Sequence, residues 1–423
     1  MKRRNLLLGA GGLTAAAAGG VLLWKPEDQG VPHDAYFSAL NELLKREGPG
    51  RPVMVLDRAR LDHNIDVIAR SVGPDKTYRV VVKSLPSVEL LRYVMNRAGT
   101  RALMVFHQPF LNVIARSFPD SDVLLGKPMP VRAAAVFYER HAGSGSAFDP
   151  QSQLQWLVDT PLRLDEYRSL ARQLGTRLRI NVEIDVGLHR GGVLEPSVLA
   201  AMLDTIASDP DHLAFAGLMG YEPHLTGLQA TLSHPAVIAV LDRYRAFIAE
   251  AESAGYEPGK LTLNGAGSHT LRIYEEDRTM NDLSAGSGVV KPTDFDTFHL
   301  ADSLPAAFIG APVLKTYDHF FVPGEPATAR LLEWWDPNVS RVHYIYGGYW
   351  KARYVSPAGI QEPFYHSTNQ EPFTTSRAGA LAVGDYAFLR PTQSERVLMQ
   401  FGDLWLVEEG KLLDRWSVFH DSG

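Results

Sequence analysis

The stretch Tyr78-Arg79-Val80-Val81-Val82-Lys83-Ser84 decides how this chain is interpreted. Its three consecutive valines are typical of a strand that is buried on both faces. The predicted strand ends at Lys83, and Leu85-Pro86-Ser87 then leads into a helix predicted to begin at Val88. A lysine at the carboxyl end of a buried strand reaches solvent, pairs with an acid or reacts. A neutral lysine amine can also form a Schiff base with a carbonyl compound, which makes Lys83 a candidate catalytic residue.

Strand-like runs alternate with helix-compatible segments through the middle of the chain. The eight runs are Tyr78–Lys83, Arg101–Phe106, Asp122–Leu125, Leu154–Val158, Leu178–Asp185, Leu213–Tyr221, Lys260–Asn264 and Asp282–Val289. Eight strands alternating with helices are the pattern of a (β/α)8 TIM-type barrel. An open doubly wound sheet would carry a Gly-x-Gly-x-x-Gly motif after its first strand, and that motif is absent. We therefore predict the α/β class, with a barrel over residues 50–290.

The pattern changes near Lys291. Short strand-like runs separated by Gly, Pro and Asp follow, among them Val313–Phe321, Ala329–Leu332 and Val397–Phe401. A chain of 423 residues has room for two domains. We predict a smaller all-β carboxy-terminal domain over residues 291–423.

Residues 1–25 have the character of a targeting segment. Lys2, Arg3 and Arg4 are followed by a stretch without charge from Leu6 to Trp24. Two arginines before a mildly apolar, Gly- and Ala-rich stretch resemble a twin-arginine export signal. An uncleaved anchor is the alternative, because about 19 apolar residues can just cross a bilayer. We expect an exported protein, periplasmic or anchored to the outer face of the inner membrane, with membrane contact only through residues 6–24.

Composition narrows the functional classes. The net charge of −6 gives no reason to expect nucleic acid or an anionic membrane surface as a partner. The absence of cysteine excludes disulfides, thiolate metal sites, thiol catalysis and a lipid anchor on cysteine. A small-molecule ligand is the partner that fits these observations.

In a barrel the chemistry lies where the strands run into the loops that follow them. The stretch Val182–Val193 follows the fifth strand, and its glycines turn the chain so that Arg190 projects into the barrel mouth. Gly/Ser loops at Asn264–Ser268 and Ser284–Gly288 follow the last two strands and can present N–H groups and hydroxyls to a phosphate. A Schiff-base lysine, a phosphate cradle and an arginine in one mouth describe a site for pyridoxal 5′-phosphate (PLP).

These residues resemble the fold type III PLP enzymes, which share the amino-terminal barrel of alanine racemase. Within that group the chain is most similar to the D-threonine aldolase and D-serine dehydratase branch, over residues 50–420. The motifs that carry the resemblance are Arg79-x-x-x-Lys83-Ser84, Val182–Val193 and Gly217-Leu218-x-x-Tyr221.

The resemblance implies roles for individual residues. Lys83 would form the Schiff base with PLP, Arg190 would contact the phenolic oxygen of the cofactor, and Tyr221 would line its ring. The phosphate would be held by Gly265, Gly267, Ser268, Gly286 and Ser287. We also expect a homodimer.

The chain departs from the branch at four positions. Val81 and Leu85 stand where the branch has histidines on either side of the lysine, and Gln393 and Glu395 stand where it has a metal-binding pair. Two oxygen ligands without a histidine make a poor divalent site. The sequence therefore favours PLP alone over PLP with a metal, and Gln393 and Glu395 are the candidate ligands if a metal binds.

The predicted function is a PLP-dependent lyase, of the aldolase or dehydratase type, acting on a β-hydroxy-D-amino acid. Lys83 and Glu395 would be catalytic, with the Glu395 carboxylate acting on the β-hydroxyl in place of the metal; alternatively Glu395 is a solvated loop charge. Two other functions stay open. One is an amino-acid racemase, whose second base would be a tyrosine of the partner's β-domain, from among Tyr317, Tyr346, Tyr349 and Tyr354. The other is a PLP-binding protein without turnover.

Overall fold

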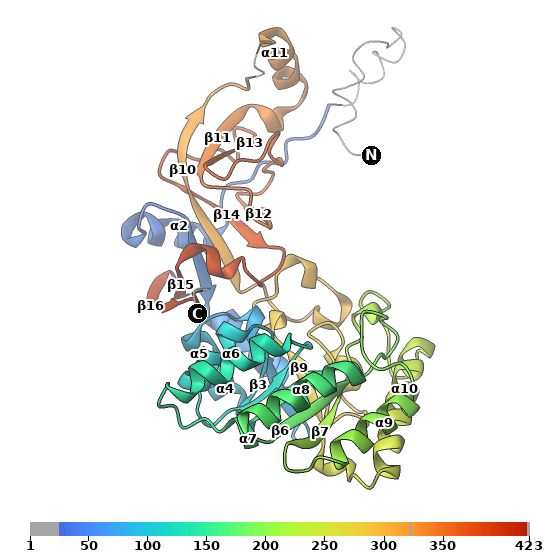
Figure 1. The fold of residues 1–423 in the computed structure, drawn as a ribbon. Helices are drawn as coiled ribbons and strands as arrows, with labels where there is room; N and C mark the ends of the chain where they lie inside the picture. Colours follow the sequence, from blue (N-terminus) through green and yellow to red (C-terminus); the bar gives the residue numbers. More distant parts are fainter. Residues whose placement is uncertain (1–24, 322–323, 421–423) are drawn as a thin grey trace. The chain divides into compact units, whose positions relative to one another are not determined.

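The computed structural model describes residues 25–321 and 324–420, which form two compact units (Figure 1). The barrel unit comprises Met54–Ala307, Pro391–Glu408 and 413–420, and the β-rich unit comprises 25–53, Phe308–Arg390 and Glu409–Leu412. The expected leader lies outside the described residues, apart from Lys25.

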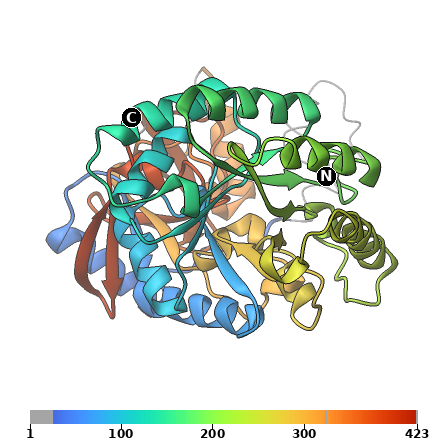
Figure 2. The same ribbon diagram turned by 60° about the horizontal axis from the view of Figure 1, so that its bottom comes forward.

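Eight parallel strands close into a barrel, which confirms the predicted TIM-type fold (Figure 2). They are β2 (Thr77–Val81), β3 (Ala102–Val105), β4 (Asp122–Leu125), β5 (Leu154–Val158), β6 (Leu178–Glu183), β7 (Leu213–Met219), β8 (Thr262–Gly265) and β9 (Asp282–Ala285). Closure occurs where β9 pairs with β2, with Ala285 opposite Val80. The strands are apolar and almost wholly buried, because a barrel covers both of their faces.

Helices surround the strands (Figure 2). They are α3 (Arg58–Val72), α4 (Val88–Ala98), α5 (Gln108–Ser117), α6 (Val131–Ala142), α7 (Pro150–Gln153), α8 (Pro161–Leu174), α9 (Pro196–Ala207) and α10 (Pro235–Ser253). Helix α4 begins at Val88 as predicted, because the Ser87 hydroxyl accepts a hydrogen bond from the Leu90 N–H, and it ends at Gly99 in the left-handed conformation. Short 3-10 helices, η5 (Leu271–Tyr274) and η6 (Ser287–Val289), follow β8 and β9.

The barrel unit also holds a parallel pair of strands, β1 (Val53–Asp57) and β15 (Asp403–Glu408). In this pair Leu56 lies opposite Leu406. The sequence placed residues 391–408 in the carboxy-terminal domain, whereas this pairing joins them to the barrel unit. The predicted strand Val397–Phe401 is instead mostly a 3-10 helix, η10 (Leu398–Phe401).

The second unit is rich in β-strands. It contains β10 (Ala307–Tyr317), β11 (Arg341–Tyr346), β12 (Ala352–Ser356), β13 (Gln370–Thr375) and β14 (Tyr386–Pro391), with α2 (Ala35–Glu47) and α11 (Pro326–Trp335); β16 (Lys411–Ser417) crosses the boundary between the units. Strand β10 pairs antiparallel with β11 and β14, and β11 pairs with β13. The predicted strand Ala329–Leu332 is wrong, because these residues lie in α11, which starts at a proline in its first turn.

None of the helices in the described ranges is long and apolar enough to cross a membrane.

Candidate active site

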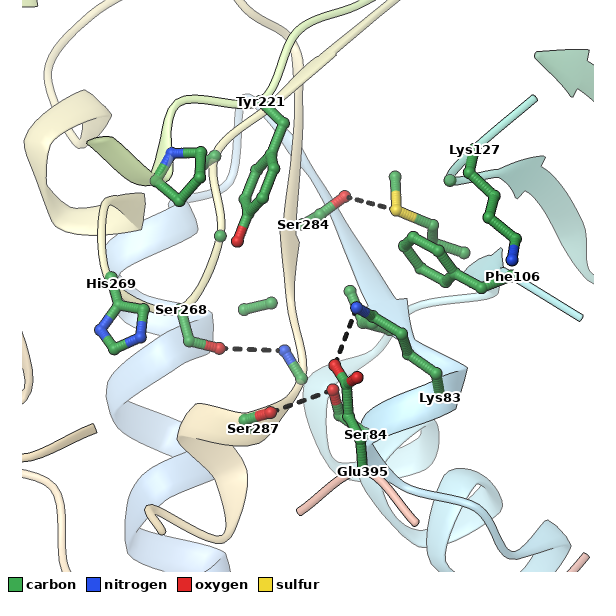
Figure 3. A pocket seen from close by; sticks show the side chains of 18 of the residues that line it. Lys83, Ser84, Phe106, Lys127, Tyr221, Ser268, His269, Ser284, Ser287 and Glu395 are labelled. Atoms are coloured by element: carbon green, nitrogen blue, oxygen red, sulfur yellow. Dashed lines mark hydrogen bonds and ion pairs between the residues drawn. The ribbon is translucent and has the colours of Figure 1, made fainter. Parts of the chain in front are cut away.

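A cavity of about 1010 Å³ opens where the barrel strands run into the loops that follow them (Figure 3). The structure brings nine of the predicted site residues to its wall: Lys83, Arg190, Tyr221, Gly267, Ser268, Gly286, Ser287, Gln393 and Glu395. Gly265 is absent from the lining, because it belongs to the buried end of β8. The individual roles expected of these residues stay predictions.

Lys83 is paired with an acid inside the cavity. The chain leaves β2 in a single 3-10 turn, η2 (Val82–Ser84), instead of continuing as a strand to Lys83. Lys83 Nζ lies 2.8 Å from Glu395 Oε1, and the two side chains are 37% and 39% exposed. The ammonium also lies 4.5 Å from the centre of the Phe106 ring. Lys83 is therefore accessible to a ligand and in contact with a group that can exchange protons with it.

Three serine hydroxyls hold the segments that carry this pair. Ser287 Oγ lies 3.0 Å from Ser84 Oγ (Figure 3). It also lies 2.9 Å from Ser394 Oγ. Ser84 follows Lys83 in the chain, and Ser394 precedes Glu395. The contact between Lys83 and Glu395 is therefore supported by hydrogen bonds to the loop after β9.

The two Gly/Ser loops converge on one oxygen atom. The N–H groups of Gly286 and Gly288 donate to Ser268 Oγ at 3.1 and 3.0 Å. A Cβ added at Gly286 would lie 2.8 Å from the Val81 Cβ, so this approach of the loop to β2 needs a glycine. Two amides aimed at one oxygen are the arrangement that binds an oxyanion.

Arg190 projects from a loop that is folded by one carboxylate. Asp185 accepts hydrogen bonds from the N–H groups of Gly187, at 2.7 Å, and His189, at 3.2 Å. Burial raises the pKa of Asp185, but these hydrogen bonds outweigh it and hold the pKa below its usual value. The Arg190 guanidinium lies 5.2 Å from the centre of the Tyr221 ring, within range of a cation–π contact. The loop therefore places a cation against the aromatic wall of the cavity.

Comparison with known proteins fits this site. Residues 56–291 match the family described as alanine racemase, N-terminal domain. The chain belongs to this family. Its enzymes depend on PLP, and the match confirms the predicted resemblance to the fold type III PLP enzymes. A search of curated proteins finds no match.

Solved structures share the fold at low identity. D-threonine aldolase from Filomicrobium marinum is 16% identical, with 87% of this chain and 96% of that chain covered and a TM-score of 0.68. D-threo-3-hydroxyaspartate dehydratase from Delftia sp. HT23 is 15% identical, with 93% and 100% covered and a TM-score of 0.62. Alanine racemase from Bacillus anthracis is 12% identical, with 87% and 97% covered and a TM-score of 0.66. At such identities the likeness shows the fold and leaves the particular reaction open.

Glu222 supports the loop after β8, a role that the sequence did not reveal. Its buried carboxylate accepts a hydrogen bond of 2.6 Å from Thr270 Oγ1, which itself accepts one of 3.0 Å from the Gly267 N–H. Glu222 also bonds the N–H of Ala266, which has a φ of 65° that non-glycine residues rarely adopt. Burial raises the pKa of Glu222 to about 7. Its position directly after Tyr221, where an apolar strand ends, is the only sequence signal for this role.

Glu183 is a second acid that sequence reasoning missed. It ends β6, lines the cavity and belongs to the Val182–Val193 motif, but no role was predicted for it. Burial raises its pKa to about 7, and the charge of Arg190 opposes that rise. The cavity therefore contains a carboxyl group that changes protonation near neutral pH.

The lining of the cavity bears on the predicted metal ligands, whereas the racemase base was expected from a partner subunit and stays a prediction. Gln393 and Glu395 both face the cavity, but within the described part of the chain no group of three or more His, Cys, Asp or Glu is arranged to hold a metal. Tyr221 is the only tyrosine among the described lining residues. The four tyrosines considered for a racemase belong to the β-rich unit, where Tyr349 stacks on His366 and Tyr354 donates to Glu371 at 3.4 Å. The expected homodimer stays a prediction.

Proposed function

We propose that this chain is a PLP-dependent lyase that acts on a β-hydroxy-D-amino acid. The observation that carries the proposal is the 2.8 Å contact between Lys83 Nζ and Glu395 Oε1 in the cavity. Membership of the alanine racemase family supports a PLP enzyme, and Glu395 is the feature of this chain that favours chemistry at a β-hydroxyl.

The residues of the cavity fit PLP. The amides of Gly286 and Gly288 already converge on a hydroxyl oxygen, so they can donate to a phosphate oxygen. Arg190 and Tyr221 offer a cation and an aromatic face to the ring, and Lys83 offers an amine to the carbonyl carbon. The cavity of about 1010 Å³ is at the large end of ordinary ligand sites, which leaves room for cofactor and substrate together. The chemistry that bound PLP supplies is that of an electron sink for a bond broken at the Cα of an amino acid.

The first task of Glu395 concerns Lys83. An ammonium cannot attack a carbonyl, because its lone pair is occupied by a proton. At 2.8 Å a proton can pass from Lys83 Nζ to Glu395 Oε1, which leaves a neutral amine and a neutral carboxylic acid. Ser84 and Ser394 keep the two residues in this contact through Ser287.

The second task concerns the β-hydroxyl of the substrate. In an aldolase-type reaction Glu395 first releases to water the proton that it took from Lys83. Its carboxylate then takes the hydroxyl proton while the Cα–Cβ bond breaks; the electrons of that bond stay at Cα, where the cofactor would accept them, and the β-carbon leaves as an aldehyde. In a dehydratase-type reaction the neutral Lys83 amine takes the Cα proton, and the protonated Glu395 gives its proton to the β-oxygen while the Cβ–O bond breaks, so that water leaves. One carboxyl group thus serves either reaction, at the position where the resembling branch has a metal ligand.

The test is aldehyde release from D-threonine and D-phenylserine, and loss of water from D-serine, with and without a chelator. We expect turnover by the parent that a chelator leaves unchanged, and a loss of roughly a hundredfold or more in Glu395→Gln. Glu257→Gln is the matched control, because Glu257 pairs with Lys260 at the same 2.8 Å but does not line the cavity. This variant should turn over like the parent.

Each contrary outcome has a meaning. Full turnover by Glu395→Gln removes the role from Glu395. Turnover that a chelator abolishes shows that a metal acts on the hydroxyl. No product from any β-hydroxy-D-amino acid contradicts the lyase, and interconversion of D- and L-alanine would then support the racemase.

A further inference from the structure

Exposed aromatic side chains gather in one part of the described chain. Eight aromatic residues in the described ranges are prominently exposed, and seven of them lie between residues 317 and 365. Those seven are Tyr317, Phe321, Trp334, Tyr346, Tyr349, Phe364 and Tyr365. All belong to the β-rich unit, so the barrel unit contributes only Phe298. Such a concentration of aromatic surface marks a site of interaction.

Helix α11 presents apolar side chains outward as well as inward. Ala329 and Leu332 pack on a small core with Phe320. On the other side of the helix Leu331 is 60% exposed and Trp334 is 56% exposed. A helix on the surface of a soluble domain normally shows charged or polar residues there. The outer face of α11 is therefore suited to an apolar environment.

Neighbouring segments extend this face. His319 Nδ1 lies 3.4 Å from Glu333 Oε1 of α11, so His319, two residues before Phe321, lies beside the helix. The Phe364 ring packs against the Phe320 ring in a tilted arrangement, with ring centres 4.8 Å apart. We call the exposed side chains of this region the α11 tip, defined as Phe321, Leu331, Trp334 and Phe364.

The beginning of the described chain meets the α11 tip. Lys25 Nζ donates to the Trp334 carbonyl oxygen at 2.8 Å and lies 3.9 Å from the centre of the Trp334 ring. Lys25 is the first charged residue after the uncharged stretch from Leu6 to Trp24. Insertion of that stretch in a bilayer would place Lys25 at the lipid surface, and Trp334 would be there with it.

We propose that the α11 tip lies on the surface of the bilayer in which residues 6–24 are anchored. Tryptophan and lysine are the residues that favour the boundary between lipid and water, because each joins an apolar body to a polar end. Leu331 and the two phenylalanines supply the apolar area that an interfacial helix buries. The lipid surface accounts both for the exposed apolar side chains of the α11 tip and for the end of the anchor segment beside Trp334, whereas a second copy of the chain accounts only for the exposed side chains. The proposal depends on the anchor and is independent of the reaction.

The absence of cysteine allows a direct test on the full chain. A polarity-sensitive fluorophore is attached to the single thiol of Leu331→Cys, and to that of Leu162→Cys as a control. Leu162 is 72% exposed and lies on barrel helix α8, away from the α11 tip in sequence and unit. Both proteins, with residues 1–24 present, are incorporated in phosphatidylethanolamine and phosphatidylglycerol vesicles with or without nitroxide-labelled headgroups.

We expect both proteins to float with the vesicles. The emission at position 331 should shift to shorter wavelength and be quenched by the nitroxide, and the emission at position 162 should do neither. Equal, water-like emission at both positions would overturn the proposal, as would failure of the full chain to float. A shift at position 331 that depends on protein concentration and occurs without lipid would also overturn it, because a second copy would then be the occupant.

Discussion

Strand β2 and the turn after it carry two cations, Arg79 and Lys83, which are used in opposite ways. Arg79 is 2% exposed, and its guanidinium bonds Asp282 through Nε at 2.9 Å and Nη2 at 2.7 Å. Its remaining donors reach the carbonyl oxygens of Leu103 and Asp122. Lys83 is 37% exposed and contacts the single acid Glu395.

The difference in burial and in bonding partners determines what Arg79 and Lys83 can each do. An arginine keeps its proton under all ordinary conditions. Arg79 Nη2 also lies 2.8 Å from Asp122 Oδ1, so two carbonyl oxygens and two carboxylates hold this guanidinium in place. A lysine can give up its proton, and a partly exposed acid can receive it. Arg79 thus joins strands of the barrel, and Lys83, in the turn after β2, presents the amine that we propose to be reactive. We therefore expect substitution of Lys83 to affect the chemistry and substitution of Arg79 to affect stability.

Lys83→Ala should abolish covalent attachment of PLP. No other side chain in the proposed site provides an amine that is paired with an acid at its strand end. Borohydride treatment followed by mass spectrometry measures the adduct, and Lys127→Ala, which removes another lysine of the cavity, should retain it. An adduct that persists in Lys83→Ala would refute the assignment.

Arg79→Met should destabilise the barrel without altering the chemistry. The change leaves Asp282 buried without its cation, which costs about 3–5 kcal/mol in the free energy of unfolding. Denaturant unfolding measures the loss. Arg97→Met is the control, because the exposed pair of Arg97 and Asp66 contributes about 1 kcal/mol or less. Equal losses in the free energy of unfolding of the two variants would mean that the buried ion pair of Arg79 contributes no more to stability than an exposed one.

Arg190→Ala should lower turnover by roughly a hundredfold or more while PLP stays attached. Loss of one preorganised donor at a developing charge has an effect of that order. Turnover and the borohydride adduct are measured in parallel, with Arg245→Ala as a control for an arginine outside the cavity. If turnover matched that of the parent, Arg190 would be only a turn residue.

Glu222→Gln should change how stability depends on pH. The pKa of Glu222 rises from 4.5 to about 7 on folding, so in that interval the folded chain holds a proton that the unfolded chain has lost. The free energy of unfolding of the parent therefore falls with rising pH through this interval, relative to the variant, by up to about 1.4 kcal/mol per pH unit. Unfolding curves across the interval measure the difference, and Glu257→Gln should parallel the parent. If the free energy of unfolding of Glu222→Gln depended on pH in the same way as that of the parent, the Glu222 carboxyl would have an ordinary pKa in the folded parent.

The barrel could be predicted from sequence because its signals are local. Runs of β-branched residues, the Ser87 cap and the Gly/Ser loops each act within a few residues. The contact between Lys83 and Glu395 could not be predicted from sequence, because these residues are far apart in the chain and are brought together only by the folded structure. The roles of Glu183 and Glu222 depend on burial, which spacing does not reveal. Helix α11 was mistaken for a strand because a short apolar run fits either structure until Phe320 supplies its core.

Barrel closure between β2 and β9 has a consequence for biosynthesis. During synthesis, Val80 cannot pair with β9 until Ala285 has been made. In the same way, Lys83 cannot contact Glu395 until nearly the whole chain has been made. Capture of PLP by Lys83 would therefore come late in folding, because the lysine is synthesised early and the residues around it are synthesised late. A chain with PLP attached to Lys83 would therefore be one whose barrel has already closed. If residues 1–25 act as the twin-arginine export signal that we predict, whose pathway carries folded proteins, cofactor loading would precede export.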